Sequence, residues 1–422
     1  MINLLATLSL AVISLSQGDA GPILGDLTET GVRVLYCGTD ATPLQLRVLN
    51  DDGQVTHQQT ITPEADQDHC VQWRVNGLTP GRRYDYQVFR NEDQPLAASS
   101  FTTAAPMDAR VPTSVGFGSC ADEGEGSSSV WDRIRLDKVD AMVLLGDTPY
   151  IDTTELATQR SRNRIFAQVP GFARLAREIP IYATWDDHDF GRNDTDGNLP
   201  GKENSRQAFL EYHPNPSAGH DDQGIYTNFR VGELEVFLLD ARWFARTMKS
   251  PFAEDQPTLL GERQWQWLRE KLASSTATFK AITTGMIFNG SVRPFKTDYW
   301  AHYPHELDAL YRLIGELEVS GVVLVGGDIH RQRIVRHDTR EVAGYDLIEF
   351  ISSPIHHKII DSANQPHPGL LYDSGEINMY VQLEVDPGHD DPVLTSRFIT
   401  AGGRMLDVRN WRLSQFTPKA GE

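Results

Sequence analysis

One short acidic stretch carries residue types that suit metal chemistry. Residues 186–189 comprise three aspartates and a histidine, and Asn193-Asp194 follow closely. The stretch comes after the apolar run 179–183, whose β-branched and aromatic residues favour a buried strand. Clustered carboxylates raise one another's pKa, so a fold that gathers them at a strand end usually has a cation there. Asp, Asn and His supply oxygen and nitrogen ligands, and the stretch therefore indicates a metal-dependent enzyme.

The same pattern recurs along the second part of the chain, where apolar runs end in polar residues. A single Asp after a strand is often only a turn or capping residue. Recurrence at successive strands instead predicts one site, because ligands of α/β layers collect beyond the carboxyl ends of the strands. The runs and the residues after them are 115–118 with Cys120, 141–145 with Asp147 and Tyr150, 179–183 with Asp187 and His188, 233–239 with Asp240, and 322–325 with Asp328 and His330.

Amphipathic segments alternate with these runs. Near-continuous Val, Leu and Ile runs predict strands that are covered on both faces by helices. We therefore expect an α/β catalytic domain over residues 112–405, with 406–422 as a C-terminal tail. The helices are expected at 128–137, 155–177, 203–212, 261–273 and 304–319.

Residues 21–105 have a different pattern, with short alternating runs separated by turn signals such as 51–53 and 79–81. This favours a small all-β sandwich, and residues 75–88 resemble the penultimate-strand region of fibronectin type III-like domains. Cys37 and Cys70 both fall here, and either a disulfide or two buried free thiols fits the sequence. Cys120 is then the odd cysteine.

The N-terminus and the charge bear on location and partners. Residues 4–16 form an apolar run that is too short to span a bilayer and suits a signal peptide over 1–20; the alternative is a buried N-terminal segment. We expect a secreted or periplasmic protein, with no transmembrane segment in the mature chain. The formal net charge of −19 argues against a nucleic-acid-binding surface. The chain is expected to act as a monomer.

The ordered strand-end motifs resemble those of the calcineurin-like metallophosphoesterase superfamily. In that superfamily the motifs are Asp-x-His, Gly-Asp-x-x-Asp, Gly-Asn-His-Asp/Glu and Gly-His-x-His. Their modified forms here look like those of the PhoD-like alkaline phosphatases, which also carry a β-sandwich ahead of the catalytic domain. The implied fold is a layered metallophosphoesterase-type β-sandwich flanked by helices. The corresponding segments are 118–120, 146–150, 186–189 and 327–330.

The resemblance implies a two-metal site in which Asp147 bridges the two ions. Cys120, Tyr150 and His330 would complete a site for Fe³⁺, since thiolate and phenolate favour a highly charged metal. Asp187 and Asp328 would hold the second ion, for which carboxylates favour Ca²⁺; Zn²⁺ or Mn²⁺ are the alternative metals. Asn289 is a further candidate ligand of that second ion.

Two other residues are candidates for contact with the phosphate. His188 could donate to a phosphate oxygen or protonate the leaving alkoxide; it could also simply orient Asp187. Arg242 could pair bidentately with phosphate oxygens, or it could be stacked or salt-bridged nearby. The pair His356-His357 is expected to be a surface feature of a loop.

These residues together predict an exported, metal-dependent phosphatase, similar to alkaline phosphatase D, that hydrolyses small phosphate monoesters by bimetal activation of water. Two alternatives stay open. One is a phosphodiesterase or phosphotriesterase with the same metal site. The other is a non-enzymatic, metal-binding extracellular recognition protein that uses the β-sandwich.

Overall fold

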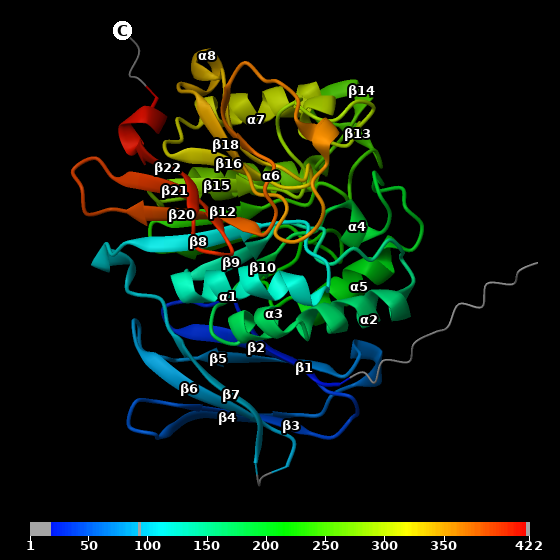
Figure 1. The fold of residues 1–422 in the computed structure, drawn as a ribbon, viewed down its shortest axis with the longest axis vertical. Helices are drawn as coiled ribbons and strands as arrows, with labels where there is room; N and C mark the ends of the chain where they lie inside the picture. Colours follow the sequence, from blue (N-terminus) through cyan, green and yellow to red (C-terminus); the bar gives the residue numbers. More distant parts are fainter. Residues whose placement is uncertain (1–17, 92–93, 419–422) are drawn as a thin grey trace, which may run out of the picture.

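The computed structural model describes residues 18–91 and 94–418, which form a small β-domain packed against a larger α/β domain (Figure 1). The predicted signal peptide lies outside the described residues except for 18–20. Within the described ranges, none of the helices has the length and apolarity needed to cross a membrane.

The N-terminal domain is an antiparallel β-sandwich, as the sequence predicts. Its side chains alternate between the core and solvent, most regularly in β3, and Trp73 and Tyr86 fill the space between the sheets. One sheet contains β1 (Ala20–Gly25), β2 (Gly31–Cys37) and β5 (Cys70–Asn76). The other contains β4 (Val55–Ile61), β3 (Leu44–Leu49), β6 (Arg83–Phe89) and β7 (Pro95–Thr102).

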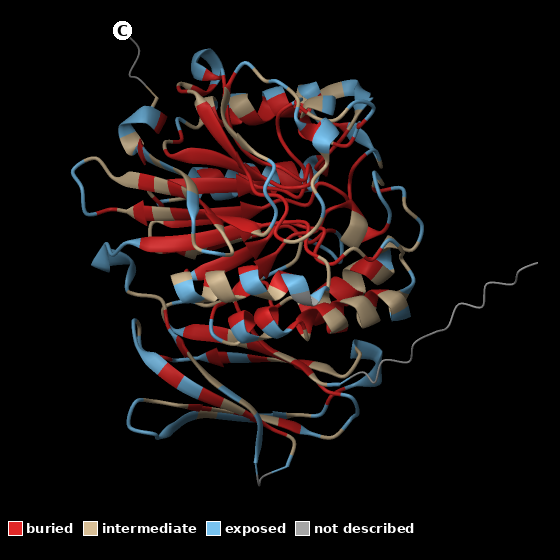
Figure 2. Cartoon of the chain, in the orientation of Figure 1, coloured by how far each residue is buried: buried red, intermediate tan, exposed pale blue. Residues whose placement is uncertain are grey.

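The α/β domain contains two larger sheets whose apolar residues join one buried core (Figure 2). In the first sheet β8, β9 and β10 are parallel, and in the second β12, β15, β16 and β18 are parallel. The six-stranded sheet has the order β10 (Ile181–Ala183), β9 (Ala141–Leu144), β8 (Thr113–Gly118), β20 (Met379–Asp386), β21 (Val393–Thr400) and β22 (Met405–Arg412). The seven-stranded sheet has the order β11 (Thr227–Val231), β12 (Leu234–Leu238), β15 (Phe279–Thr283), β16 (Val322–Gly326), β18 (Leu347–Ile351), β17 (Gln332–His337) and β19 (Leu370–Ser374).

Helices flank these sheets, and those beside the six-stranded sheet lie between it and the N-terminal sandwich (Figure 1). They are α1 (Ser128–Asp137), α2 (Leu156–Ala167), α3 (Pro170–Ala176) and α5 (Lys202–Tyr212). The predicted helix 155–177 is in fact two helices, because Pro170 cannot continue α2 and instead begins α3. On the seven-stranded sheet lie α6 (Gly261–Ser274) and α7 (Pro304–Glu316). The short elements α4 (Asp187–Phe190), α8 (Arg340–Ala343), β13 (Lys249–Ser250) and β14 (Ala253–Pro257) complete the domain.

The expectation of a C-terminal tail from residue 406 is wrong for most of that segment. β22 pairs with β21 at the edge of the six-stranded sheet, and the 3₁₀ turn Leu413–Phe416 follows it. Trp411 packs edge to face on Phe350, which anchors the strand. The other side chains of β22 are mostly exposed or half-buried, and this polar edge character hides the strand in the sequence.

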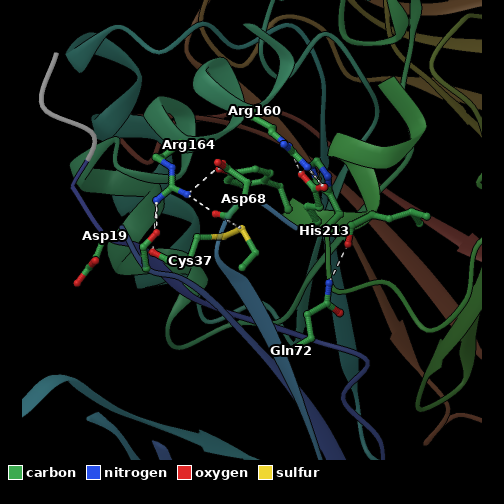
Figure 3. The surroundings of a disulfide bond; sticks show 12 residues. Asp19, Cys37, Asp68, Gln72, Arg160, Arg164 and His213 are labelled. Carbon is green, nitrogen blue, oxygen red and sulfur yellow. Dashed lines mark hydrogen bonds and ion pairs between the residues drawn. A yellow bond between two sulfur atoms is a disulfide. The ribbon is translucent and has the colours of Figure 1, made fainter. Parts of the chain in front are cut away.

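Cys37 and Cys70 form a disulfide between β2 and β5, next to the contact between the two domains (Figure 3). Arg164 of α2 reaches into the sandwich beside it and donates to the carbonyls of Gly38 at 3.0 Å and Asp68 at 2.8 Å. Arg164 also forms an ion pair with the Asp68 carboxylate at 3.0 Å. The disulfide therefore links the strand ends that contact the α/β domain.

Candidate metal centre and catalytic site

The candidate ligands Cys120, Asp147 and His330 meet at the carboxyl ends of β8, β9 and β16. One donor atom from each residue lies within 4.8 Å of the others, and all three side chains are buried. Cys120 Sγ is 3.4 Å from Asp147 Oδ2. A thiol, a carboxylate and an imidazole so close together form a donor set for a transition metal.

The backbone of this cluster adopts a conformation that non-glycine residues rarely take. The φ angles are +57° at Cys120, +53° at Asp147, +68° at Asp328 and +56° at His330. Each left-handed residue costs free energy, and such residues gather where function requires a particular side-chain direction. These left-handed residues recur at the ends of three strands, which indicates a functional site where the sequence pattern predicted one.

Tyr150 and His330 present their polar atoms to the same cluster. His330 Nδ1 donates to the carbonyl of Lys358 at 2.5 Å, which fixes the tautomer and leaves Nε2 unprotonated. Tyr150 Oη lies 3.1 Å from that Nε2 atom. The neutral imidazole is thus oriented for ligation, with the phenol beside it.

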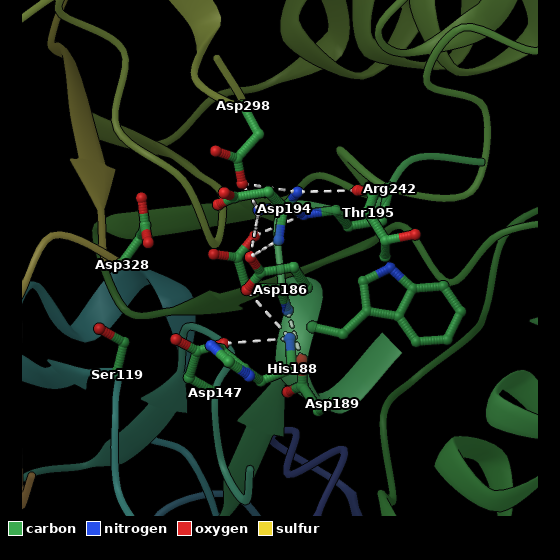
Figure 4. A network of polar contacts seen from close by, with 12 residues as sticks. Ser119, Asp147, Asp186, His188, Asp189, Asp194, Thr195, Arg242, Asp298 and Asp328 are labelled. Atoms are coloured by element: carbon green, nitrogen blue, oxygen red, sulfur yellow. Dashed lines mark hydrogen bonds and ion pairs between the residues drawn. The ribbon is translucent and has the colours of Figure 1, made fainter. Parts of the chain in front are cut away.

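A second group of carboxylates shares Asp147 with the first group. Oxygens of Asp147, Asp186 and Asp328 lie within 4.8 Å of one another, and Asp147 also meets Asp187 and His188 within the same limit (Figure 4). Asp186 Oδ2 and Asp328 Oδ2 are buried, and neither accepts a hydrogen bond among the described residues. Because an unpaired buried carboxylate oxygen is costly, these atoms fit a bound cation.

Electrostatics agree with that fit. Burial, followed by repulsion from Cys120 and Asp187, raises the pKa of Asp147 well above its usual value. Burial likewise raises the pKa of Asp328 to about 6 and that of the Cys120 thiol above its ordinary value. Burial alone would also raise the pKa of Asp187, but Arg242 and Lys296 hold it below its usual range. A metal ion would stabilise the anionic form of all four groups.

His188, at the start of α4, lies beside the donor cluster and is partly exposed to solvent. Its Nδ1 lies 2.5 Å from Asp152 Oδ1, so Nε2 is the ring nitrogen left for a substrate. Its ring also packs against Tyr150, with the centroids 4.6 Å apart. The backbone amides of Ile151 and Asp152 donate to the His188 carbonyl, which couples the two loops.

These groups lie at a cavity of about 470 Å³. Asp147, Tyr150 and His330 form part of its wall, together with His188 and Asp328. The cavity also exposes three cationic side chains, which are those of Arg293, Lys296 and Lys358. In a protein of net charge −19, this local cationic wall suits an anionic substrate.

Arg242 does not reach the cavity, and the expectation that it contacts phosphate is contradicted. Its side chain is 1% exposed, and Nε donates to Asp186 Oδ1 at 2.7 Å. Nη1 donates to Thr195 O at 3.0 Å, and both Nη atoms donate to Asp298 Oδ2 (Figure 4). Because its donors are engaged in this way, Arg242 connects the carboxylates of Asp186 and Asp298 on the side away from the cavity.

Asn289 is also engaged elsewhere, contrary to the expectation that it ligates the second ion. Its Nδ2 donates to Glu349 Oε2 at 2.8 Å, and its Oδ1 accepts from the amide of Ser291 at 2.7 Å. Glu349 in turn meets His337 at 2.8 Å. The carboxamide belongs to a buried network with Glu349 of β18 and His337 of β17.

Three residues of the cavity were not anticipated from the sequence. Asp152 orients His188, and Lys296 forms ion pairs with Asp298 and Asp328 at 3.0 Å. His357, expected on the surface, stacks on Tyr150 with the centroids 4.4 Å apart. Burial and the neighbouring His330 lower its pKa to about 4. Only Asp152, two residues after Tyr150, had a sequence signal, since it lies within a motif loop.

A model of the PhoD-like phosphatases matches residues 115–382. This range contains the donor cluster, the cavity lining and the whole seven-stranded sheet, but not β21 and β22 of the six-stranded sheet. The chain belongs to the PhoD-like phosphatase family. It is 25% identical over 342 residues to alkaline phosphatase D of Bacillus subtilis, covering 69% of this chain and 58% of that protein. The chain thus spans less than two thirds of that relative.

Two solved structures support the fold assignment of this PhoD-like chain. A structure of PhoD aligns with a TM-score of 0.75 at 19% identity, covering 93% of this chain and 92% of the other. A purple acid phosphatase from yellow lupin (Lupinus luteus) seeds aligns with a TM-score of 0.70 at 13% identity, covering 93% and 74%. The mixed α/β fold with its preceding β-domain is therefore confirmed.

Proposed function

We propose that this chain is an exported, metal-dependent phosphatase that hydrolyses phosphate monoesters. The observation that carries the proposal is the position of Asp147. Its carboxylate is shared by the Cys120–His330 donor group and the Asp186–Asp328 carboxylate group, at the wall of the cavity. Bimetal phosphatase sites need such a shared ligand, because it holds two cations a few ångströms apart.

The types of donor atom favour a different metal ion at each of the two positions. Cys120, Tyr150 and His330 suit Fe³⁺, while Asp187 and Asp328 suit Ca²⁺; Zn²⁺ or Mn²⁺ remain the alternatives. When bound, the ions would supply Lewis-acid polarisation of the phosphate ester. Burial of the donors, and the raised pKa of Asp147 and Cys120, support strong binding at neutral to alkaline pH, where metal ions compete least with protons.

The protein's own groups perform the remaining chemistry. Asp152 orients His188 so that Nε2 faces the cavity, where it can donate a proton to the leaving ester oxygen. The cationic side chains of Arg293, Lys296 and Lys358 attract the phosphate and favour a dianionic monoester over a less charged diester or triester. His357 covers Tyr150 and limits the access of water to the phenol.

Export rests on separate observations. The leader-like run 4–16 is one, and the disulfide between Cys37 and Cys70 is the other, since stable disulfides form in oxidising compartments. The third cysteine, Cys120, is buried and stays free for ligation. A periplasmic or secreted location follows from these together.

The test combines metal analysis with a substrate panel. Wild-type protein should contain two metal ions per chain and hydrolyse an aryl phosphate monoester faster than the matching diester and triester. Asp147→Asn should lose metal and about 10³-fold or more in kcat/KM together. Full activity of Asp147→Asn would refute the mechanism. A faster diester reaction would reassign the substrate class, and metal binding without any turnover would favour a recognition protein.

A further inference from the structure

Lys296 is a buried cation inside the carboxylate cluster of the second metal site. It is 5% exposed, and its Nζ lies 3.0 Å from Asp328 Oδ1 and 3.0 Å from Asp298 Oδ1. A third carboxylate, that of Asp194, lies 3.3 Å away. An ammonium group therefore contacts the carboxylate that is expected to ligate a metal ion.

The two buried cations of this cluster are held differently. Arg242 has its donors distributed over Asp186, Asp298 and a backbone carbonyl, and its planar fork fixes it in place. Among the residues that the structure describes, the Lys296 ammonium pairs only with carboxylates, and it is a compact charge on a flexible four-carbon stem. It also lines the cavity, so its ammonium has open space toward which it can move.

The carboxylate cluster could accept one more cation, but that cation would compete with Lys296 for Asp328. Asp328 Oδ2 and Asp186 Oδ2 are buried and have no hydrogen-bond partner within residues 18–91 and 94–418, whereas Asp328 Oδ1 contacts the Lys296 ammonium. A divalent ion on Asp328 would lie within a few ångströms of the ammonium, where like charges repel strongly in a buried site. Both cations cannot remain on Asp328 without a large energetic cost.

We propose that the Lys296 ammonium and a divalent cation are alternative occupants of the Asp328 carboxylate, so that Lys296 sets the affinity of the second metal site. This inference rests on the two-metal arrangement of the proposed function. In the metal-depleted protein Lys296 neutralises the carboxylates and preserves their arrangement. When the ion binds, the ammonium moves from Asp328 toward the cavity, where it faces the substrate.

The test measures calcium binding directly. Metal-stripped wild type, Lys296→Met and Lys296→Arg would be titrated with Ca²⁺ by calorimetry. Lys296→Met keeps the length of the stem and removes the competing charge, so its Kd for Ca²⁺ should fall about tenfold or more. Lys296→Arg retains the charge and should show no tightening. Lys280→Met is the matched control, because Lys280 is equally buried but donates only to the carbonyls of Ala277 and Ser320.

Thermal stability provides a second readout. Without metal, Lys296→Met should melt below wild type, because its carboxylates lose their partner; saturating Ca²⁺ should raise its Tm by more than it raises that of wild type. Calcium affinity that is unchanged or weaker in Lys296→Met would overturn the inference. If the wild type still hydrolyses the monoester in that case, the proposed function stands. Tightening in Lys296→Met, together with an inactive wild type, would leave the inference intact and refute the function.

Discussion

Replacement of Arg242 by methionine tests whether this residue organises the carboxylates or binds phosphate. The guanidinium is 1% exposed and pairs with Asp186 and Asp298, which are themselves buried. Removing one partner of a buried ion pair costs about 3–5 kcal/mol, because the other partner remains charged in a dry site. Asp186 would lose its ion pair, whereas Asp298 keeps Lys296 at 3.0 Å, so we expect a loss of about 4 kcal/mol in the metal-free protein.

Urea unfolding of the catalytic domain, followed by tryptophan fluorescence, measures this loss; Trp185 and Trp243 lie close to the site. Excess Ca²⁺ should recover part of it by neutralising the carboxylates. Arg269→Met is the control, since Arg269 is 51% exposed where it pairs with Glu316 and should cost at most about 1 kcal/mol. A variant of Arg242 with wild-type stability but a raised inhibition constant for inorganic phosphate would refute this explanation and restore the phosphate contact.

Three further outcomes are expected. Asp152→Asn should lower kcat about 10- to 100-fold and shift the alkaline limb of the pH–rate profile, because His188 loses the carboxylate that orients it. The metal content should stay unchanged. An unshifted pH–rate profile would exclude this role for Asp152. His213 lies at the domain contact (Figure 3), and burial lowers its pKa to about 4. The unfolded chain therefore binds the extra proton between pH 6.5 and 4, and stability should fall by about 3 kcal/mol as the pH drops through that window. His213→Gln should flatten this dependence in urea titrations at each pH, and an equally steep fall would contradict it. Replacement of both Cys37 and Cys70 by serine should cost about 3–4 kcal/mol for a 33-residue separation, measured by calorimetry, with the metal content of the catalytic domain as the control; unchanged melting of the β-domain would argue against it.

The parts of the site that the sequence predicted share one physical origin. Asp147, Asp328 and His330 each follow a buried parallel strand, and strand ends at one edge of a sheet must lie together. The apolar runs that mark these strands are among the strongest local signals in a sequence. The helices were predicted within a few residues because the spacing of apolar residues in an amphipathic segment is also a local signal. The exception is the predicted helix that Pro170 divides in two.

The parts that the sequence did not predict depend on long-range packing. Lys296 and His357 lie on loops, and nothing within a few residues of either indicates which strand ends they face. The sequence left Arg242 open between a phosphate contact and a salt bridge, because a motif position shows neither burial nor partners. Its partner Asp298 is 56 residues away. β22 was missed because an edge strand has a polar pattern that resembles a tail.

The order of the three cysteines along the chain has a consequence for biogenesis. Cys37 and Cys70 both belong to the N-terminal sandwich, whereas Cys120 follows the first strand of the next domain. A chain that enters an oxidising compartment N-terminus first presents the sandwich pair before the ligand thiol emerges. If the sandwich closes its disulfide at that stage, no thiol is left for Cys120 to mispair with. Domain order would thereby keep Cys120, the proposed metal ligand, from forming a non-native disulfide with Cys37 or Cys70.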